Sequence, residues 1–394
     1  MNHWPTKSLG EVAQVTAGDP APQRPEDFSD DGVPFVRMQD VGRFGQTTCL
    51  AATKDHISAS ASAKLKQFPV GSILVPKSGA SIRLNHRAIL GIRAHVVSHL
   101  AVIVPHPSLN TNFAYYWLCA TDLSGVAHQA DLPSMKTSDL ARLRLPVPPL
   151  SEQERIVKLL SEADELRKLR TQADNRTATL ISALFHKMFG DPEKNTTCCR
   201  SAMLGEIISS TKLGLVRGAN EMDDTLPFPY IRMDAILGNG NLILTPIKRV
   251  NATAAEVAEF SVRDGDFLFN TRNSRELVGK TALFEGRGTY LFNNNIMRIR
   301  FNDSVDPHYM IALFQTSFIK RQLEASKSGT TSVVAIYFKN LSNITVLVPP
   351  LPLQKDFTMY AKEIYALQAE QTATRKWLDD LFQSMLHRAF NGEL

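Results

Sequence analysis

The chain has 394 residues, of which 43% are hydrophobic and 21% are charged, and its formal net charge is +5. This length exceeds one ordinary hydrophobic core, so we expect two or more folded domains, and the composition excludes a disordered or fibrous protein. The longest apolar runs, such as residues 100–104, are far too short to cross a bilayer, and the first ten residues lack the apolar core of a secretion signal. The sequence therefore predicts a cytoplasmic protein without a membrane partner.

Charge and cysteines narrow the class further. The segment between Asp55 and Asp122 holds no carboxylate, although it contains six Lys or Arg and five His residues. Such a segment favours a polyanionic partner over the alternative, an ordinary solvated surface. The four cysteines show no Cys-x-x-Cys spacing, so we expect reduced thiols and no zinc site.

The first 150 residues alternate short strands with a helix. Runs rich in β-branched residues and bounded by turns predict strands at 33–38, 73–75, 96–104 and 143–147. Helical spacing of apolar residues predicts a helix at 113–120. Residues 1–150 are therefore expected to form a mixed α/β domain.

A long amphipathic helix is predicted to occupy residues 151–190. Ser151 and Glu154 fit a capping box at its start, and Gly190 fits its end. About 39 residues at 1.5 Å each make this helix roughly 58 Å long. Its apolar positions follow a heptad pattern that is interrupted at Arg170 and Thr177, which favours a coiled coil over packing against its own domain.

The second half of the chain repeats the first. Residues 9–12 (LGEV) recur at 204–207 (LGEI), and residues 33–38 (VPFVRM) recur at 228–233 (FPYIRM), both at an offset of 195. Residues 145–150 (LPVPPL) recur at 346–351 (VLVPPL) at an offset of 201, which also aligns the two long helices. The repeat predicts strands at 230–233, 266–269, 296–301 and 344–348, a helix at 309–322, a second mixed domain at 191–350 and a final helix at 351–394.

The fold class expected is therefore α+β, with two tandem mixed α/β domains separated by paired long helices. The heptad pattern predicts the apolar residues of the coiled-coil or partner interface. These are Ile156, Leu159, Leu166, Leu180, Leu184, Phe357, Tyr360, Ile364, Leu367, Leu381 and Met385.

Motifs for catalysis and metal binding are absent or have simpler explanations. The nearest approach to an amino-methyltransferase loop is Asp306-Pro307-His308-Tyr309, which is better explained as a capped helix start. No carboxylate stands two residues before a lysine as in common nucleases, and no phosphate-binding loop is found. His95 and His99 lie about 13 Å apart on a strand, too far to share a metal ion. Asp264-Gly265-Asp266 is a turn, because its repeat copy lacks carboxylates. We expect no catalytic and no metal-binding residue.

Each domain instead carries polar loops suited to reading DNA bases. Arg and Lys recognise guanine, Asn recognises adenine, and Ser or Thr contacts either, although such loops also occur on any protein surface. The candidates in the first domain are Lys77, Ser78, Arg83, Asn85, His86, Arg87, His128, Gln129, Ser134 and Lys136. The candidates in the second domain are Arg272, Asn273, Ser274, Arg275, Lys280, Asn294, Lys327, Ser328 and Thr330.

These features resemble the specificity subunit of type I restriction-modification systems. The resemblance covers the whole chain and rests on residues 145–157 (LPVPPLSEQERIV), the heptad helix, residues 348–354 (VPPLPLQ) and residues 389–394 (AFNGEL). One departure is Pro352-Leu353, where the first copy has Ser151-Glu152, so the second helix cap differs.

The resemblance implies two target-recognition domains that read the halves of an asymmetric, interrupted double-stranded DNA target, with the helices forming an antiparallel coiled coil. It also implies two methyltransferase subunits that bind S-adenosylmethionine and methylate adenine, and two restriction subunits that use ATP and Mg²⁺. This chain would hold no cofactor and would not itself be an enzyme. The alternatives are a methylation-only system, a scaffold that does not read DNA, and a stand-alone methyltransferase-nuclease.

Overall fold

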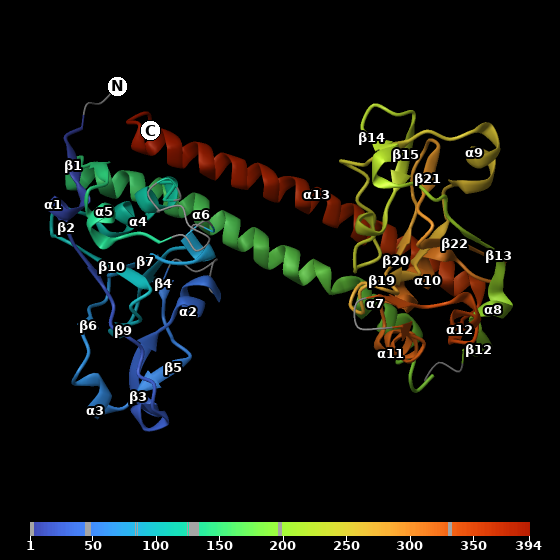
Figure 1. Ribbon diagram of the computed structural model, residues 1–394, viewed down its shortest axis with the longest axis horizontal. Helices are drawn as coiled ribbons and strands as arrows, with labels where there is room; N and C mark the ends of the chain where they lie inside the picture. Colours follow the sequence, from blue (N-terminus) through green and yellow to red (C-terminus); the bar gives the residue numbers. More distant parts are fainter. Residues whose placement is uncertain are drawn as a thin grey trace. The chain divides into compact units, whose positions relative to one another are not determined.

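The computed structural model describes residues 4–43, 49–82, 84, 86–123, 125, 134–195, 199–329 and 333–394. It divides into two compact units, which we call the first unit (1–172 with 372–394) and the second unit (173–371). Each unit combines mixed β-sheets with helices, and each contains parts of both long helices (Figure 1). The predicted α+β class is confirmed. No helix in the described part of the chain is long and apolar enough to span a membrane.

In the first unit, successive side chains of the central strands point alternately into two hydrophobic cores on opposite faces of the central sheet. Ile73, Val75 and Ile103 face a core that includes α4 (Thr111–Ala120), whereas Leu74 and Val102 face the other sheet. The central sheet has the order β2 (Ala13–Ala17), β10 (Leu100–Pro105), β7 (Ile73–Pro76), β8 (Ala88–Leu90) and β4 (Cys49–Leu50). The other has the order β5 (Asp55–Ile57), β3 (Phe28–Val36), β9 (Ala94–Val96) and β6 (Gln67–Phe68). The unit is completed by the pair β1 (Thr6–Ser8) and β11 (Arg144–Pro146) and by α1 (Leu9–Val12), α2 (Met38–Arg43), α3 (Ala59–Ser62) and α5 (Thr137–Ala141).

The second unit is built the same way. Phe267, Phe269 and Ile299 face the core around α10 (Pro307–Phe314), and Leu268 and Ile296 face the opposite core. Its central sheet has the order β13 (Ile208–Leu213), β22 (Ile296–Phe301), β18 (Phe267–Asn270) and β20 (Thr281–Leu283). The other large sheet has the order β14 (Met222–Asp223), β16 (Arg249–Val250), β15 (Phe228–Ile231), β21 (Tyr290–Phe292) and β17 (Ser261–Val262). The remaining elements are the pair β12 (Arg200–Met203) and β25 (Thr345–Val348), the sheet β19 (Arg272–Asn273), β24 (Val334–Ala335) and β23 (Ser328–Gly329), and α8 (Leu204–Ile207), α9 (Ala254–Phe260), α11 (Ser317–Ala325) and α12 (Phe338–Leu341).

Most predicted elements are confirmed, but within the two mixed domains one predicted strand and one predicted helix are each divided in two. The strand predicted at 96–104 is two strands of different sheets, because a turn closed by the Leu100 N–H and the Val97 carbonyl separates β9 from β10. The helix predicted at 309–322 is divided into α10 and α11, because the Thr316 hydroxyl caps a new helix by accepting from the Ile319 N–H. Asp306 caps α10 and Pro307 occupies its first turn, as predicted.

A repeated glutamine holds the start of each long helix. In the first unit the Gln153 Oε1 accepts from the Asn110 N–H (2.8 Å), and its Nε2 donates to the carbonyls of Ser108 (3.1 Å) and Pro148 (2.8 Å). The Gln354 side chain in the second unit makes the equivalent bonds with the Asp306 N–H (2.9 Å) and with the carbonyls of residues 304 (3.1 Å) and 349 (2.7 Å). Both glutamines are fully buried. The fold therefore explains why a glutamine recurs at this position in both halves of the chain.

Replacing Gln153 with alanine is expected to destabilise the first unit by roughly 2–4 kcal/mol, because three hydrogen bonds are lost at a buried site. Thermal unfolding of the full chain measures the effect, and Q354A should act similarly in the second unit. Q172A, at an exposed position of the same long helix, is the control and should leave the unfolding midpoint unchanged. An unchanged midpoint for Q153A would contradict this role.

The long helices are α6 (Leu150–Ala178), α7 (Leu180–Phe189) and α13 (Leu351–Phe390). In the first unit, the Arg167 Nε donates to the Asp379 carboxylate of α13 (2.7 Å), and Arg155 donates to a backbone oxygen of Leu394, just after α13. As the residue number in α6 rises from 155 to 167, the number of its partner therefore falls from 394 to 379. The second unit shows the same order, since α6 contributes Thr177 against Gln371 (2.6 Å) and α7 contributes Phe185 against Phe357. The predicted antiparallel pairing is therefore confirmed within each unit.

Two details of the predicted helix at 151–190 are wrong. The helix begins at Leu150, and the N–H groups of Glu152 and Gln153 bond the Pro149 carbonyl, so Ser151 lies inside the first turn and does not form a capping box with Glu154. The helix is also interrupted at residue 179. There the hydroxyls of Thr177 and Thr179 bond carbonyls of the preceding turn, a contact that bends helices. Gly190 ends α7 with a φ of 71°, as predicted.

The seam between the helices differs from the predicted one. Ile156 and Phe357 are buried, but the residues Leu159, Leu184, Ile364 and Met385 are only half-buried, and Leu166, Leu180, Tyr360, Leu367 and Leu381 are exposed. The neighbouring Leu160 and Phe382 are buried instead. Polar pairs occupy part of the seam in each unit, Arg167 with Asp379 in the first and Thr177 with Gln371 in the second. The structure therefore does not place Leu166, Leu180, Tyr360, Leu367 and Leu381 in the helix–helix seam, whereas contact of these residues with a partner protein stays a prediction.

Candidate nucleic-acid interface

Three polar segments of the first unit meet at the end of its central sheet. The Lys77 N–H donates to the His99 carbonyl (3.0 Å), and the Met135 N–H donates to the Lys77 carbonyl (2.8 Å). Ser78 pairs with Ser134 in an isolated β-bridge, and the Ser78 Oγ lies 2.9 Å from the His99 Nδ1. The structure thus brings Lys77, Ser78 and Ser134 together, with Lys136 exposed two residues further on. We call this place the loop junction of the first unit.

The second unit has the same junction. The Thr271 N–H donates to the Asn295 carbonyl (2.8 Å), and the Ile336 N–H donates to the Thr271 carbonyl (2.9 Å). Arg272 pairs with Ala335, and β24 in turn pairs with β23, which begins at Ser328. The candidates from residues 272–275 and 327–328 therefore gather around the end of β18, where residues 271–272 and 335–337 match residues 77–78 and 134–136 of the first unit.

Arg272 differs from the neighbouring cations in having no ion-pair partner among the described residues. It is also exposed. Arg275 instead pairs with Glu324, and the Lys327 Nζ lies 2.6 Å from the same carboxylate. Hydrogen bonds from Lys327 and Arg275 lower the pKa of Glu324, which keeps this network charged. This network lies beside Arg272 in the chain. The Arg272 guanidinium itself pairs with no described carboxylate.

The amide candidates are partly engaged within the fold. The Asn273 Oδ1 accepts from the Ser274 N–H (2.8 Å), and the Asn273 Nδ2 lies 3.9 Å from the Met233 Sδ. Lys280 and Asn294 are half-buried, and so is His86 in the first unit. Asn273 therefore has fewer free hydrogen-bonding groups to offer a ligand than Arg272, and Lys280, Asn294 and His86 are less exposed than Arg272.

Arg87 lies inside the first unit. Only 4% of its surface is exposed, and its Nη1 donates to the His86 carbonyl (2.6 Å). Its Nε and Nη2 have no hydrogen-bond partner among the described residues. Burial lowers the pKa of Arg87 to about 10 and raises that of Cys119 to about 11. The guanidinium stays charged at neutral pH but does not reach a surface where it could contact a base, so the structure gives no support to that prediction.

Five candidates lie outside the described residues and stay predictions. They are Arg83, Asn85, His128, Gln129 and Thr330. The described part of the chain contains no group of three or more His, Cys, Asp or Glu residues that could hold a metal ion.

Two residues at the junctions were missed at the sequence level. His99 is not among the predicted DNA-binding residues, and it differs from His95, whose ring nitrogens are occupied by the Ser62 Oγ (2.8 Å) and the Lys66 carbonyl (2.8 Å). His99 is instead exposed beside Ser78. Tyr337 is 58% exposed and takes the place in the second unit that Lys136 has in the first. The offset of 201 between Lys136 and Tyr337 was the signal that could have found it.

Comparisons with known proteins agree with the repeated architecture. The family model of the type I restriction modification DNA specificity domain matches residues 1–176 and 204–371. The specificity subunit of the Escherichia coli K12 type I restriction enzyme EcoKI is 22% identical over 402 residues, covering 93% of this chain and 83% of that protein.

Solved structures of the same kind share the fold. The type I S subunit from M. genitalium matches with a TM-score of 0.59 at 15% identity, over 99% of this chain and 97% of that one. A chain from a structure on the assembly and conformational transition of a type I restriction-modification system matches with a TM-score of 0.60 at 20% identity, over 99% and 98%. Because the family model matches most of both halves, the chain belongs to the type I restriction-modification DNA specificity family and is the non-catalytic specificity subunit of such a system.

Proposed function

We propose that residues 1–150 and 191–350 are two target-recognition domains, each of which reads one half of an asymmetric, interrupted DNA sequence through its loop junction. One observation supports this proposal. The two loop junctions have the same backbone hydrogen bonds but carry different side chains. Ser78 stands where the second unit has Arg272, and Lys136 stands where it has Tyr337. Because base edges are distinguished by the donors and acceptors that contact them, unlike side chains on one framework read unlike half-sites.

The helices 151–190 and 351–394 act in this proposal as the spacer between the two domains. Antiparallel helices of equal length relate two equivalent domains by a pseudo-twofold axis. Two such domains contact one face of a duplex when their half-sites lie about one helical turn, roughly 34–36 Å, apart. The length of the helix pair then sets the length of the unread segment between the half-sites.

The partners in this proposal are two methyltransferase subunits that bind S-adenosylmethionine and methylate adenine, together with two restriction subunits that use ATP and Mg²⁺. Exposed leucines at equivalent positions of the long helices support the binding of two copies of the same partner subunit. Leu166 and Leu381 are exposed in the first unit, and their repeat equivalents Leu367 and Leu180 are exposed in the second. Duplicated apolar positions on a surface suit the docking of two identical partners.

Exchanging residues 1–150 for the corresponding domain of another specificity subunit tests the proposed division of labour. We expect the methylated sequence to change in one half-site only, because the second junction is untouched. Footprinting of the complex should protect two short separated segments, with protection that weakens as salt rises. Simultaneous change of both half-sites would contradict the proposal, and a complex without a footprint would favour a scaffold that does not read DNA.

A further inference from the structure

Arg37 and Arg232 occupy the same place in the two units. They are the arginines of the repeated segments 33–38 and 228–233. Arg37 follows β3, which pairs in parallel with β9, and Arg232 follows β15, which pairs in parallel with β21. The next hydrogen bond is also equivalent, since the Val97 N–H donates to the Val36 carbonyl (3.0 Å) and the Asn293 N–H donates to the Ile231 carbonyl (2.9 Å).

The intramolecular partners of the two arginines differ. Arg37 forms an ion pair with Asp55 of β5, and its guanidinium carbon lies 5.7 Å from the ring centroids of both Phe28 and Phe35. Arg232 instead pairs with Asp234 (3.2 Å), two residues further along the chain. The strand position that holds Asp55 in the first unit holds a cation, Lys248, in the second.

Other repeated residues do have equivalent contacts. The buried glutamines 153 and 354 make matching bonds, as described above. Only glycine fits at positions 18 and 214, because each lies against the backbone of a neighbouring segment. A Cβ added to Gly18 would lie 2.0 Å from the Val96 carbonyl oxygen, and one added to Gly214 would lie 2.1 Å from the Phe292 carbonyl oxygen. The fold thus explains these repeats but not the repeated arginine, which points to a common ligand outside the chain.

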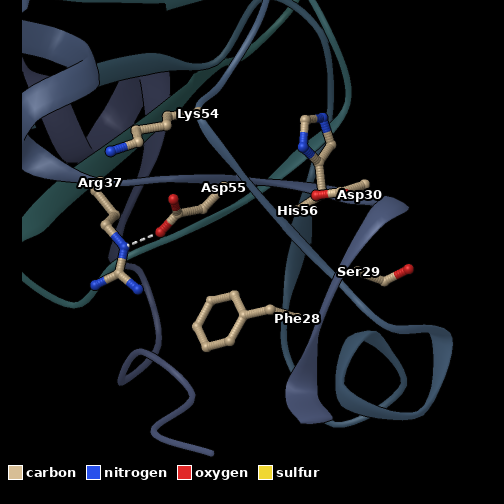
Figure 2. Close-up of a pocket in the computed structure, with 7 residues that line it drawn as sticks. All are labelled: Phe28, Ser29, Asp30, Arg37, Lys54, Asp55 and His56. Atoms are coloured by element: carbon tan, nitrogen blue, oxygen red, sulfur yellow. Dashed lines mark hydrogen bonds and ion pairs between the residues drawn. The ribbon is translucent and has the colours of Figure 1, made fainter. Parts of the chain in front are cut away.

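The Arg37 guanidinium borders a hollow that a ligand can enter. A hollow of about 320 Å³ is lined by Phe28, Ser29, Asp30, Arg37, Lys54, Asp55 and His56 (Figure 2). The Arg37 side chain is 35% exposed and that of Arg232 is 44% exposed, so both guanidinium groups can be reached from solvent. Lys54 adds a second cation to the lining of the hollow, and Ser29 adds a hydroxyl donor. The lining also holds two carboxylates, Asp55, which pairs with Arg37, and Asp30.

We propose that Arg37 and Arg232 each bind a phosphate of the DNA backbone, at one equivalent place per unit and independently of base sequence. Two half-sites that differ in their bases still share the sugar–phosphate backbone, so a contact repeated on both domains fits that backbone. On binding, each guanidinium exchanges its carboxylate partner for a phosphate oxygen, and the Phe28 and Phe35 rings keep Arg37 in place. This inference rests on the proposed reading of DNA by both domains.

Salt titration of R37Q and R232Q in the full chain, within its purified complex, tests the inference. Binding is measured to the target duplex and to an unrelated duplex of equal length between 50 and 200 mM salt. Each substitution should raise the Kd for both duplexes about three- to tenfold and reduce the slope of log K against log salt by about one. The methylated sequence should not change. R24Q is the control, because Arg24 is exposed and paired with Asp27, and its repeat counterpart is Ala219; its slope should equal that of the wild type.

Two further variants separate a phosphate contact from a structural role. R37K retains the charge and should keep the wild-type slope. D55N removes the competing carboxylate and should lower the Kd for both duplexes, whereas a purely structural ion pair predicts a lower unfolding midpoint without tighter binding. Unchanged slopes in R37Q and R232Q, or a loss confined to the target duplex, would overturn the inference. A wild-type complex with no preference for its target would instead overturn the proposed function itself.

Discussion

Replacing Arg272 with alanine is expected to reduce discrimination at one half-site by about 1–3 kcal/mol per base pair contacted, and to leave the other half-site unaffected. Arg272 is exposed, forms no ion pair among the described residues, and projects from a strand that β24 holds in place. Its loss therefore removes a side chain without disturbing the backbone of the junction. Methylation rates on duplexes altered one base pair at a time measure the effect.

R275A provides the matched control for this prediction. The Arg275 guanidinium already pairs with Glu324, so its removal should change discrimination much less than the removal of Arg272. An equal loss at both half-sites in R272A, or an equal loss on every DNA sequence, would show that Arg272 does not read bases.

Removing one heptad from each long helix is expected to shorten the segment between the half-sites by about 3 base pairs. Seven residues at 1.5 Å make about 10 Å of helix, and each base pair occupies about 3.4 Å. Residues 165–171 and 374–380 are suitable, because the bonded residues Arg167 and Asp379 show that these segments face each other in the first unit. A whole heptad preserves the face that each helix presents to the other. The DNA must also adjust its twist, so the methylation rate should fall.

Mapping the methylated sequence reports the new spacing directly. Removal of three residues from each helix is the control, because it rotates the seam away from the partner helix and should abolish methylation. An active complex that lacks one heptad in each helix yet keeps the original spacing would show that the helices do not set the distance.

The repeated framework could be predicted because it follows from local patterns. The strands β7 and β18 recur at an offset of 194 and the glutamines 153 and 354 at an offset of 201, and the members of each pair have equivalent roles in the structure. The register of the helix pair could not be predicted in the same way. Leu159 and Leu160 are both apolar neighbours, and only the packing against α13 and the core buries Leu160 in preference. Polar pairs in the seam, such as Thr177 with Gln371, also conceal its position from a heptad count.

The sequence could predict which loops carry the candidate DNA-binding residues, but not which of these loops lie next to each other in the fold. Lys77 and Arg272 were found because they follow strongly apolar strands. Their meeting with His99, Ser134 and Tyr337 depends on hydrogen bonds between segments that are far apart in the chain. The sequence also could not show that Arg87 is buried. A cation in a polar loop looks accessible in the sequence, but the fold buries it, with the consequence that its pKa falls to about 10.

Long-read mapping of methylated adenines in the host genome, with the gene for this chain present and deleted, tests the central claim most directly. The account predicts a motif of two unlike half-sites separated by a constant number of unread base pairs, and it predicts that methylation of this motif disappears with the gene. Methylation that persists after deletion, or that shows no such two-part sequence preference, would contradict it.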